Sequence, residues 1–122
     1  MTIDLMTNDQ SMTPEKVIQK QFEGFVERDL EKFLSCYKAD VGLYHFPENK
    51  PFLQGIDAMR VNYQDVFDNS PNLNAQLISR MVFKNKVIDR EIITNRKEVK
   101  YREIVVIYEV EDGLISTVRY IS

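Results

Sequence analysis

The first half of the chain carries apolar residues at the spacing of α-helices. Thr13 and Pro14 are typical of a helix start, because the Thr13 hydroxyl can accept a hydrogen bond from a free amide and Pro14 has no amide to leave unpaired. A second start is expected at Asp29 and a third after Gly55. Gly24, inside the first predicted helix, costs about 1 kcal/mol relative to alanine, which indicates close packing at that point. The predicted buried faces are Val17, Ile18, Gln21, Phe22, Phe25 and Val26, then Leu30, Phe33, Leu34 and Tyr37, and then Ile56, Met59, Tyr63, Val66 and Phe67.

The second half of the chain is rich in Val, Ile and Tyr, which favour strands. Short turn signals separate the last four of these runs, and this is typical of an antiparallel meander. Helices that precede strands indicate an α+β fold, in which a curved sheet wraps around three N-terminal helices. The predicted strands are residues 41–46, 77–83, 87–93, 99–110 and 114–121.

Four segments in this order resemble the nuclear transport factor 2-like superfamily, and within it the small SnoaL-like and steroid isomerase-like proteins. The resemblance implies a cone-shaped α+β fold, a cystatin-like α+β barrel whose curved mixed or antiparallel sheet wraps around three N-terminal helices. It also implies a pocket at the open end and a homodimer formed through the sheet. We expect residues 1–12 to be a flexible leader and residues 13–122 to be the SnoaL-like domain. The segments that carry the resemblance are residues 28–34 with Tyr37, 53–60, 85–91 and 108–115.

The composition excludes some classes of function but does not identify one. With 122 residues, 43% of them hydrophobic and 29% charged, the chain fits one globular domain. A net charge of -3 argues against a nucleic-acid partner, and no apolar run is long enough for a membrane helix. The single cysteine, Cys36, excludes an intrachain disulfide, so we expect a cytoplasmic protein. No cofactor fingerprint or metal-ligand spacing is present, and we expect no cofactor.

The resemblance to steroid isomerases implies three catalytic groups: a first-strand aspartate, a first-helix tyrosine and a protonated aspartate on a later strand. The tyrosine position falls near Phe22, which has no hydroxyl. The late acid falls near Ile107, and no carboxylate lies between Ile104 and Tyr108. The sequence therefore does not predict isomerase chemistry.

Two residues remain as candidate catalytic groups. His45, the only histidine, occupies the region of the isomerase base, and an imidazole can act as a general acid or base at neutral pH. Glu91 shares a strand face with Asp89, and burial of that face would raise the pKa of Glu91. Arg80, Asp89 and Glu91 could also resemble the Asp-Arg-Asp group of superfamily epoxide hydrolases. A structural ion pair or a solvated face is the alternative.

The sequence therefore favours an uncharacterised SnoaL-like single-domain protein that binds a small apolar molecule in the cone pocket. The alternative is an enzyme of the isomerase, cyclase or hydratase type that uses His45 as general acid or base. A pure interaction module is a third possibility, which no feature of the sequence favours. The residues predicted to line the pocket are Phe22, Phe46, Met59, Tyr63, Asp89 and Tyr108.

Overall fold

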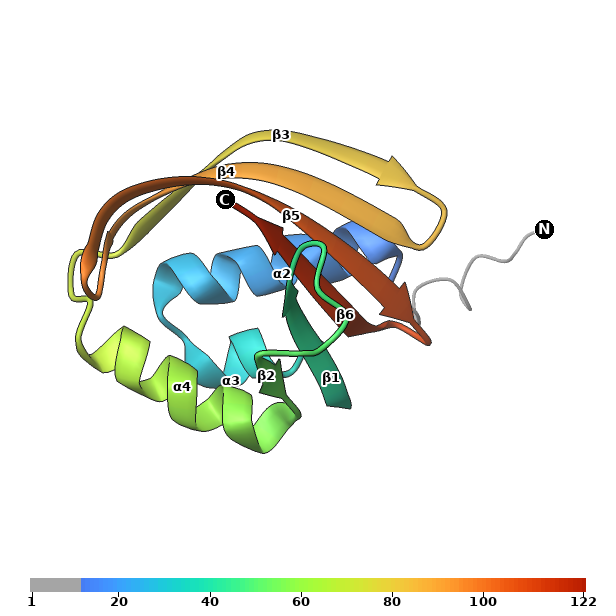
Figure 1. Cartoon of the computed structure of the whole chain (residues 1–122), viewed down its shortest axis with the longest axis horizontal. Helices are drawn as coiled ribbons and strands as arrows, with labels where there is room; N and C mark the ends of the chain where they lie inside the picture. The colour runs from blue at the N-terminus through green and yellow to red at the C-terminus, as the bar shows by residue number, and fades with distance from the viewer. Residues whose placement is uncertain (1–11) are drawn as a thin grey trace.

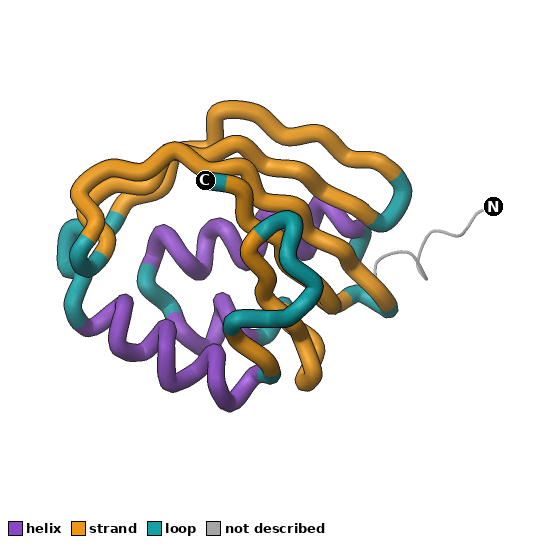
Figure 2. The backbone as a smooth tube through the Cα atoms, in the orientation of Figure 1, coloured by secondary structure: helices purple, strands orange, loops and turns teal. Residues whose placement is uncertain are grey.

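The computed structural model describes residues 12–122 of the chain. Residues 1–11, most of the predicted leader, lie outside the described residues. Along the described chain, two helices come first and are followed by two strands and a third helix. Four long strands then complete the fold (Figures 1 and 2). The helices are α2 (Pro14–Glu27), α3 (Leu30–Leu34) and α4 (Ile56–Asp68), and the strands are β1 (Tyr37–His45), β2 (Leu53–Gln54), β3 (Asn74–Phe83), β4 (Lys86–Arg96), β5 (Val99–Glu111) and β6 (Leu114–Ile121).

The six strands form one open mixed sheet in the order β2-β1-β6-β5-β4-β3. The strands β3 to β6 form the predicted antiparallel meander, and β1 joins it by parallel pairing with β6. The sheet does not close into a barrel, because β2 and β3 lie at its two edges. Figure 1 shows the sheet curving around the helices, which confirms the predicted α+β cone.

The helix ends follow the predicted local chemistry. The Thr13 hydroxyl accepts a hydrogen bond from the Lys16 amide at 3.3 Å, and the Asp29 carboxylate accepts one from the Lys32 amide at 3.1 Å. Between these caps, Arg28 adopts a left-handed backbone with φ 54° and ends α2. The two-residue strand β2 was not predicted from the sequence. The predicted start of β1, at Val41, is four residues later than the observed start at Tyr37.

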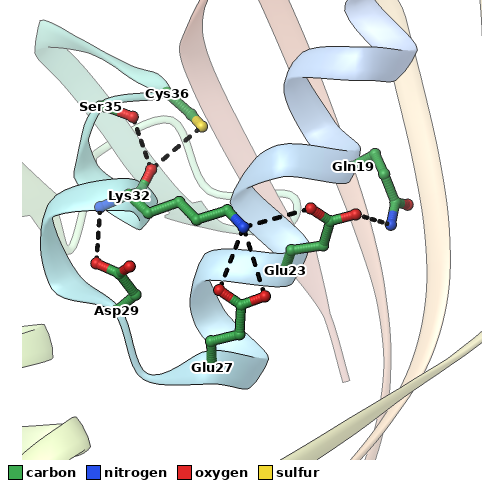
Figure 3. Close-up of polar contacts among 7 residues, drawn as sticks. All are labelled: Gln19, Glu23, Glu27, Asp29, Lys32, Ser35 and Cys36. Atoms are coloured by element: carbon green, nitrogen blue, oxygen red, sulfur yellow. Dashed lines mark hydrogen bonds and ion pairs between the residues drawn. The ribbon is translucent and has the colours of Figure 1, made fainter.

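The junction of α2 and α3 explains the glycine inside the first helix. A Cβ atom on Gly24 would lie 2.7 Å from the Phe33 amide nitrogen, so only glycine allows the two helices to meet this closely. On the solvent side, Lys32 of α3 forms ion pairs with Glu23 at 3.4 Å and Glu27 at 3.2 Å (Figure 3). The Lys32 carbonyl also accepts hydrogen bonds from Ser35 and Cys36. The close packing predicted at Gly24 is confirmed.

The concave face of the sheet supplies half of the core. On β4, the alternate side chains of Val87, Asp89, Glu91 and Ile93 are all buried, as the sequence pattern allowed if this face pointed into the cone. Two carboxylates are thus placed inside the molecule beside valine and isoleucine. This arrangement positions the candidate site.

Candidate functional site

A cavity of about 230 Å³ lies between the helices and the concave face of the sheet. Its lining comes from α2, α3, α4, β1, β4, β5 and β6, so almost every element of the fold contributes a side chain. The apolar part of the lining is Phe22, Phe25, Phe33, Phe52, Ile93, Val99, Ile104 and Val106. The polar part is Gln21, Tyr37, His45, Asn62, Tyr63, Glu91, Arg96, Arg102, Tyr108 and Tyr120. The cavity is therefore apolar along its walls, with polar groups at defined points.

Gln21 of α2 holds two tyrosines of the sheet in place. The Tyr37 hydroxyl donates to Gln21 Oε1 at 3.0 Å, and Gln21 Nε2 donates to the Tyr108 hydroxyl at 3.0 Å. All three side chains are buried, and burial raises the pKa of Tyr37 and Tyr108 well above the ordinary value. Within residues 12–122, Tyr108 accepts this hydrogen bond and has no acceptor for its own proton. Tyr108 is thus a donor available to a ligand.

Glu91 is the buried acid of the cavity. It is 4% exposed, and its Oε2 atom has no hydrogen-bond partner among the described residues. Burial, and then the neighbouring Asp89 carboxylate, raise the pKa of Glu91 to about 8, although Arg80 acts in the opposite direction. At neutral pH the side chain is a neutral carboxylic acid that can donate one hydrogen bond and accept others.

Asp89, one step along the same strand face, is fully buried and belongs to an ion pair. Arg80 Nε donates to Asp89 Oδ1 at 2.7 Å, and Arg80 Nη2 donates to Oδ2 at 2.9 Å. Arg80 Nη1 donates further to the Gln19 side chain at 2.9 Å. Asp89, which was predicted to line the pocket, is not among the residues that line the cavity, and the ion pair with Arg80 occupies its carboxylate.

His45 lies at the end of β1, opposite Tyr120 of β6, and is largely exposed. Its ring stacks on Phe52 with the ring centroids 4.1 Å apart and the planes 13° from parallel. The cavity lining includes both rings, and it also includes Glu91 and Tyr63. The fold therefore brings the two candidate catalytic residues to one cavity, with Glu91 inside it and His45 on its exposed side.

Three of the other five predicted pocket residues line the cavity. Phe22, Tyr63 and Tyr108 line the cavity, whereas Phe46 and Met59 do not. Phe46 is 51% exposed, because β1 ends at His45 and Phe46 lies in the turn that follows. Met59 is completely buried, because it fills the core beneath α4.

The sequence analysis missed several lining residues that carry polar groups. Gln21 belonged to a predicted apolar face, and a single amide on such a face is a sign of an internal hydrogen bond. Arg102 alternates with Ile104, Val106 and Tyr108 on β5, so the period of two was visible in the sequence. Whether that face of β5 points into the cavity depends on the pairing register of the strands, which cannot be read from the sequence.

Within residues 12–122, no group of three His, Cys, Asp or Glu side chains could hold a metal ion. None of the described helices is long and apolar enough to cross a membrane. Cys36 is a free, buried thiol, and burial raises its pKa above the ordinary value.

The fold and the cavity define a small α+β cone protein with an internal pocket. The family model of the SnoaL-like domain matches residues 18–118. The chain therefore belongs to the SnoaL-like family, and its fold is that of the nuclear transport factor 2-like superfamily. No curated protein matches the chain.

Solved structures share this fold at low sequence identity. An uncharacterised cystatin-fold protein from Novosphingobium aromaticivorans has a TM-score of 0.84 at 17% identity, over 92% of this chain and 100% of that chain. A protein from Sinorhizobium meliloti proposed to be a polyketide cyclase has a TM-score of 0.72 at 14% identity, over 86% and 93%. A protein from Kribbella flavida proposed to be a ketosteroid isomerase has a TM-score of 0.72 at 20% identity, over 88% and 76%.

Proposed function

We propose that this protein binds a small molecule with an apolar ring body and at least one oxygen, held in the cavity of the cone. The observation that carries the proposal is the buried Glu91 carboxyl, which lines an apolar cavity and has an oxygen with no partner among residues 12–122. An unpartnered buried polar atom costs free energy, and a ligand that hydrogen bonds to it recovers that free energy.

The dimensions and donors of the cavity restrict the ligand. A cavity of about 230 Å³ has room for a body of one or two rings. Glu91 and Tyr108 both present hydroxyl protons at neutral pH, so a carbonyl or hydroxyl oxygen is the complementary group. The aromatic walls, among them Phe22 and Phe25, supply the apolar contacts.

Thermal unfolding with naphthol as the probe tests this proposal. A ligand at a hundred times its dissociation constant stabilises the folded state by about 2.7 kcal/mol, which raises Tm by several degrees. We expect this rise in the wild type and in Val61→Phe, a control on the exposed side of α4, and its loss in Ile104→Phe, which fills the cavity. Equal rises in Val61→Phe and Ile104→Phe would place binding elsewhere and contradict the proposal.

Acid-base catalysis is the second candidate function, and the shared cavity of Glu91 and His45 favours it. A neutral Glu91 can donate to a ligand carbonyl while the His45 imidazole takes a proton from the adjacent carbon. Exchange of the protons beside the carbonyl of indanone into deuterated water, followed by NMR, tests this step. We expect faster exchange with the wild type than with His45→Ala or Glu91→Gln; no acceleration over buffer would remove the catalytic proposal.

A second copy of this chain is the partner that the outer face of the sheet would accommodate. Met81, Ile88 and Ile107 are consecutive register partners on that face and leave apolar surface on three adjacent strands. Beside them, Arg90 pairs with Glu103 on the same face. A face that mixes apolar groups with charges of both signs can meet its own two-fold copy without net repulsion.

A further inference from the structure

Two arginines line the cavity in addition to the groups already described. Arg102 lies on the inward face of β5 opposite Ile93, and Arg96 ends β4 at the turn that leads into β5. The next inward residue of β5, Ile104, lies opposite Glu91, so Arg102 is a diagonal neighbour of Glu91 across the two strands. Such neighbours have backbone positions about 7–8 Å apart. One ligand of one or two rings can therefore reach Glu91 and Arg102 together.

Neither guanidinium has an anionic partner among residues 12–122. Arg102 donates to the neutral Ser122 hydroxyl at 2.9 Å, and the Arg96 guanidinium makes no hydrogen bond to the described part of the chain. The carboxylate of Asp65, which reaches the same hairpin turn from α4, is already paired with Lys97. Both arginines are only partly exposed, so each holds donors that are partly removed from water without a counter-charge.

The charges of the cavity lining are therefore unbalanced. Among the lining residues that belong to the described part of the chain, Glu91 is the only carboxylic acid. Its raised pKa keeps it neutral at pH 7, whereas both arginines stay charged. A chain whose net charge is -3 thus surrounds an apolar cavity that carries two cations. Opposite charges attract more strongly in such a partly enclosed site than at an open surface.

We propose that the ligand is an amphipathic carboxylate, with its ring body in the apolar cavity and its carboxylate bound by Arg96 and Arg102. This assignment rests on the proposed function, since it names the class of small molecule that the cavity takes. Planar guanidinium groups pair with carboxylates through two parallel hydrogen bonds, which gives direction as well as affinity. Glu91 and Tyr108 then remain for an oxygen on the opposite side of the ring body.

The test compares two probes of the same shape, naphthalene carboxylate and naphthalene carboxamide, by isothermal titration at pH 7 and low salt. We expect the carboxylate to bind the wild type about tenfold to hundredfold more tightly than the carboxamide, as hydrogen bonds to charged groups imply. Arg96→Gln and Arg102→Gln should each reduce this ratio, and the double variant should bring it close to one. The control is Lys100→Gln, which removes an exposed cation of β5 outside the cavity and should keep the ratio.

The carboxamide also reports on the fold and on the proposed function. We expect the carboxamide to bind the arginine variants with the same affinity as the wild type, which would show that their cavity is intact. Equal affinities of the two probes for the wild type would overturn the carboxylate proposal and leave small-molecule binding in place. A wild type that binds neither probe at millimolar concentration would overturn both proposals. A carboxylate preference that survives in the double variant, or that disappears in Lys100→Gln, would overturn the assignment to Arg96 and Arg102.

Discussion

Glu91 shows how a single residue acquires its chemistry from its surroundings. In an unfolded chain its carboxyl has an ordinary pKa of 4.5, whereas in the fold burial raises the pKa to about 8. The charged neighbours that shift this pKa are Asp89, which raises it, and Arg80, which lowers it. Glu91 in turn helps to raise the pKa of the buried tyrosines Tyr37, Tyr108 and Tyr120. The side chain is consequently a proton donor in the pH range in which most carboxyls are anions.

This shift predicts how stability depends on pH. Between pH 4.5 and 8 the folded state keeps a proton on Glu91 that the unfolded chain has released. The free energy of unfolding therefore falls as pH rises through this interval and levels off above pH 8, by an amount on the order of a few kcal/mol. Glu91→Gln resembles the protonated acid and removes this decline, so we expect the variant to be more stable than the wild type at pH 8.5 and similar at pH 5.

Urea unfolding between pH 5 and pH 9 measures the effect. The matched control is Glu111→Gln, which removes an exposed carboxylate at the end of β5 and should leave the wild-type decline in place. If Glu91→Gln and the wild type lose stability in parallel as pH rises, Glu91 does not carry the proton.

At the scale of elements, the pairing of β3 with β4 decides which charges enter the core. Arg80 and Asp89 are direct register partners, and their side chains form a two-point ion pair under the sheet, 10% and 0% exposed. One step along, Arg90 of β4 pairs with Glu103 of β5 on the outer face, where both side chains are about half exposed. Both ion pairs join an arginine to a carboxylate and both include a residue of β4, but the first pair is buried and the second is exposed.

This contrast predicts unequal costs for removing the arginines. Arg80→Met leaves the buried Asp89 carboxylate without its partner and should cost about 3–5 kcal/mol of stability. Arg90→Met breaks an exposed pair and should cost less than about 1 kcal/mol. The double variant Arg80→Met/Asp89→Leu should recover most of the loss, because both buried charges are gone. Urea unfolding at pH 7 measures all three, and equal losses in the two single variants would contradict a structural role for the buried pair.

The elements also show what the sequence could predict. Helix ends at Thr13 and Asp29 depend on contacts within four residues, and such local chemistry is legible without a structure. The alternation of side chains between the two faces of β4 could also be predicted, because it has a period of two. The positions of Phe46 and Met59 relative to the cavity could not be predicted, because they depend on packing between elements that are distant in the sequence. Arg96 and Arg102 were missed for the same reason: they reach the cavity only through the β4–β5 register.

At the scale of the molecule, the open sheet has two faces with different surroundings. The concave face covers the helices and the cavity, whereas no helix or strand of residues 12–122 covers the outer face (Figures 1 and 2). Ile107 points outward between the inward-facing Val106 and Tyr108, next to Ile88 of β4 and Arg119 of β6. A second copy bound to this face would leave the cavity of each copy accessible, so dimer formation and ligand binding are independent of each other in this proposal.

Ile107→Glu tests the proposed dimer. A stable interface buries about 800 Å² on each partner, and a carboxylate placed at its apolar centre would lose hydration without a partner. We expect the wild type to sediment as a dimer at micromolar concentration and Ile107→Glu to sediment as a monomer with unchanged circular dichroism. Val61→Glu is the control, because Val61 is an exposed apolar residue of α4, away from the sheet, and should leave the dimer intact. A wild type that sediments as a monomer would contradict the dimer. The naphthol-induced rise in Tm should persist in monomeric Ile107→Glu, since each copy contains a complete cavity.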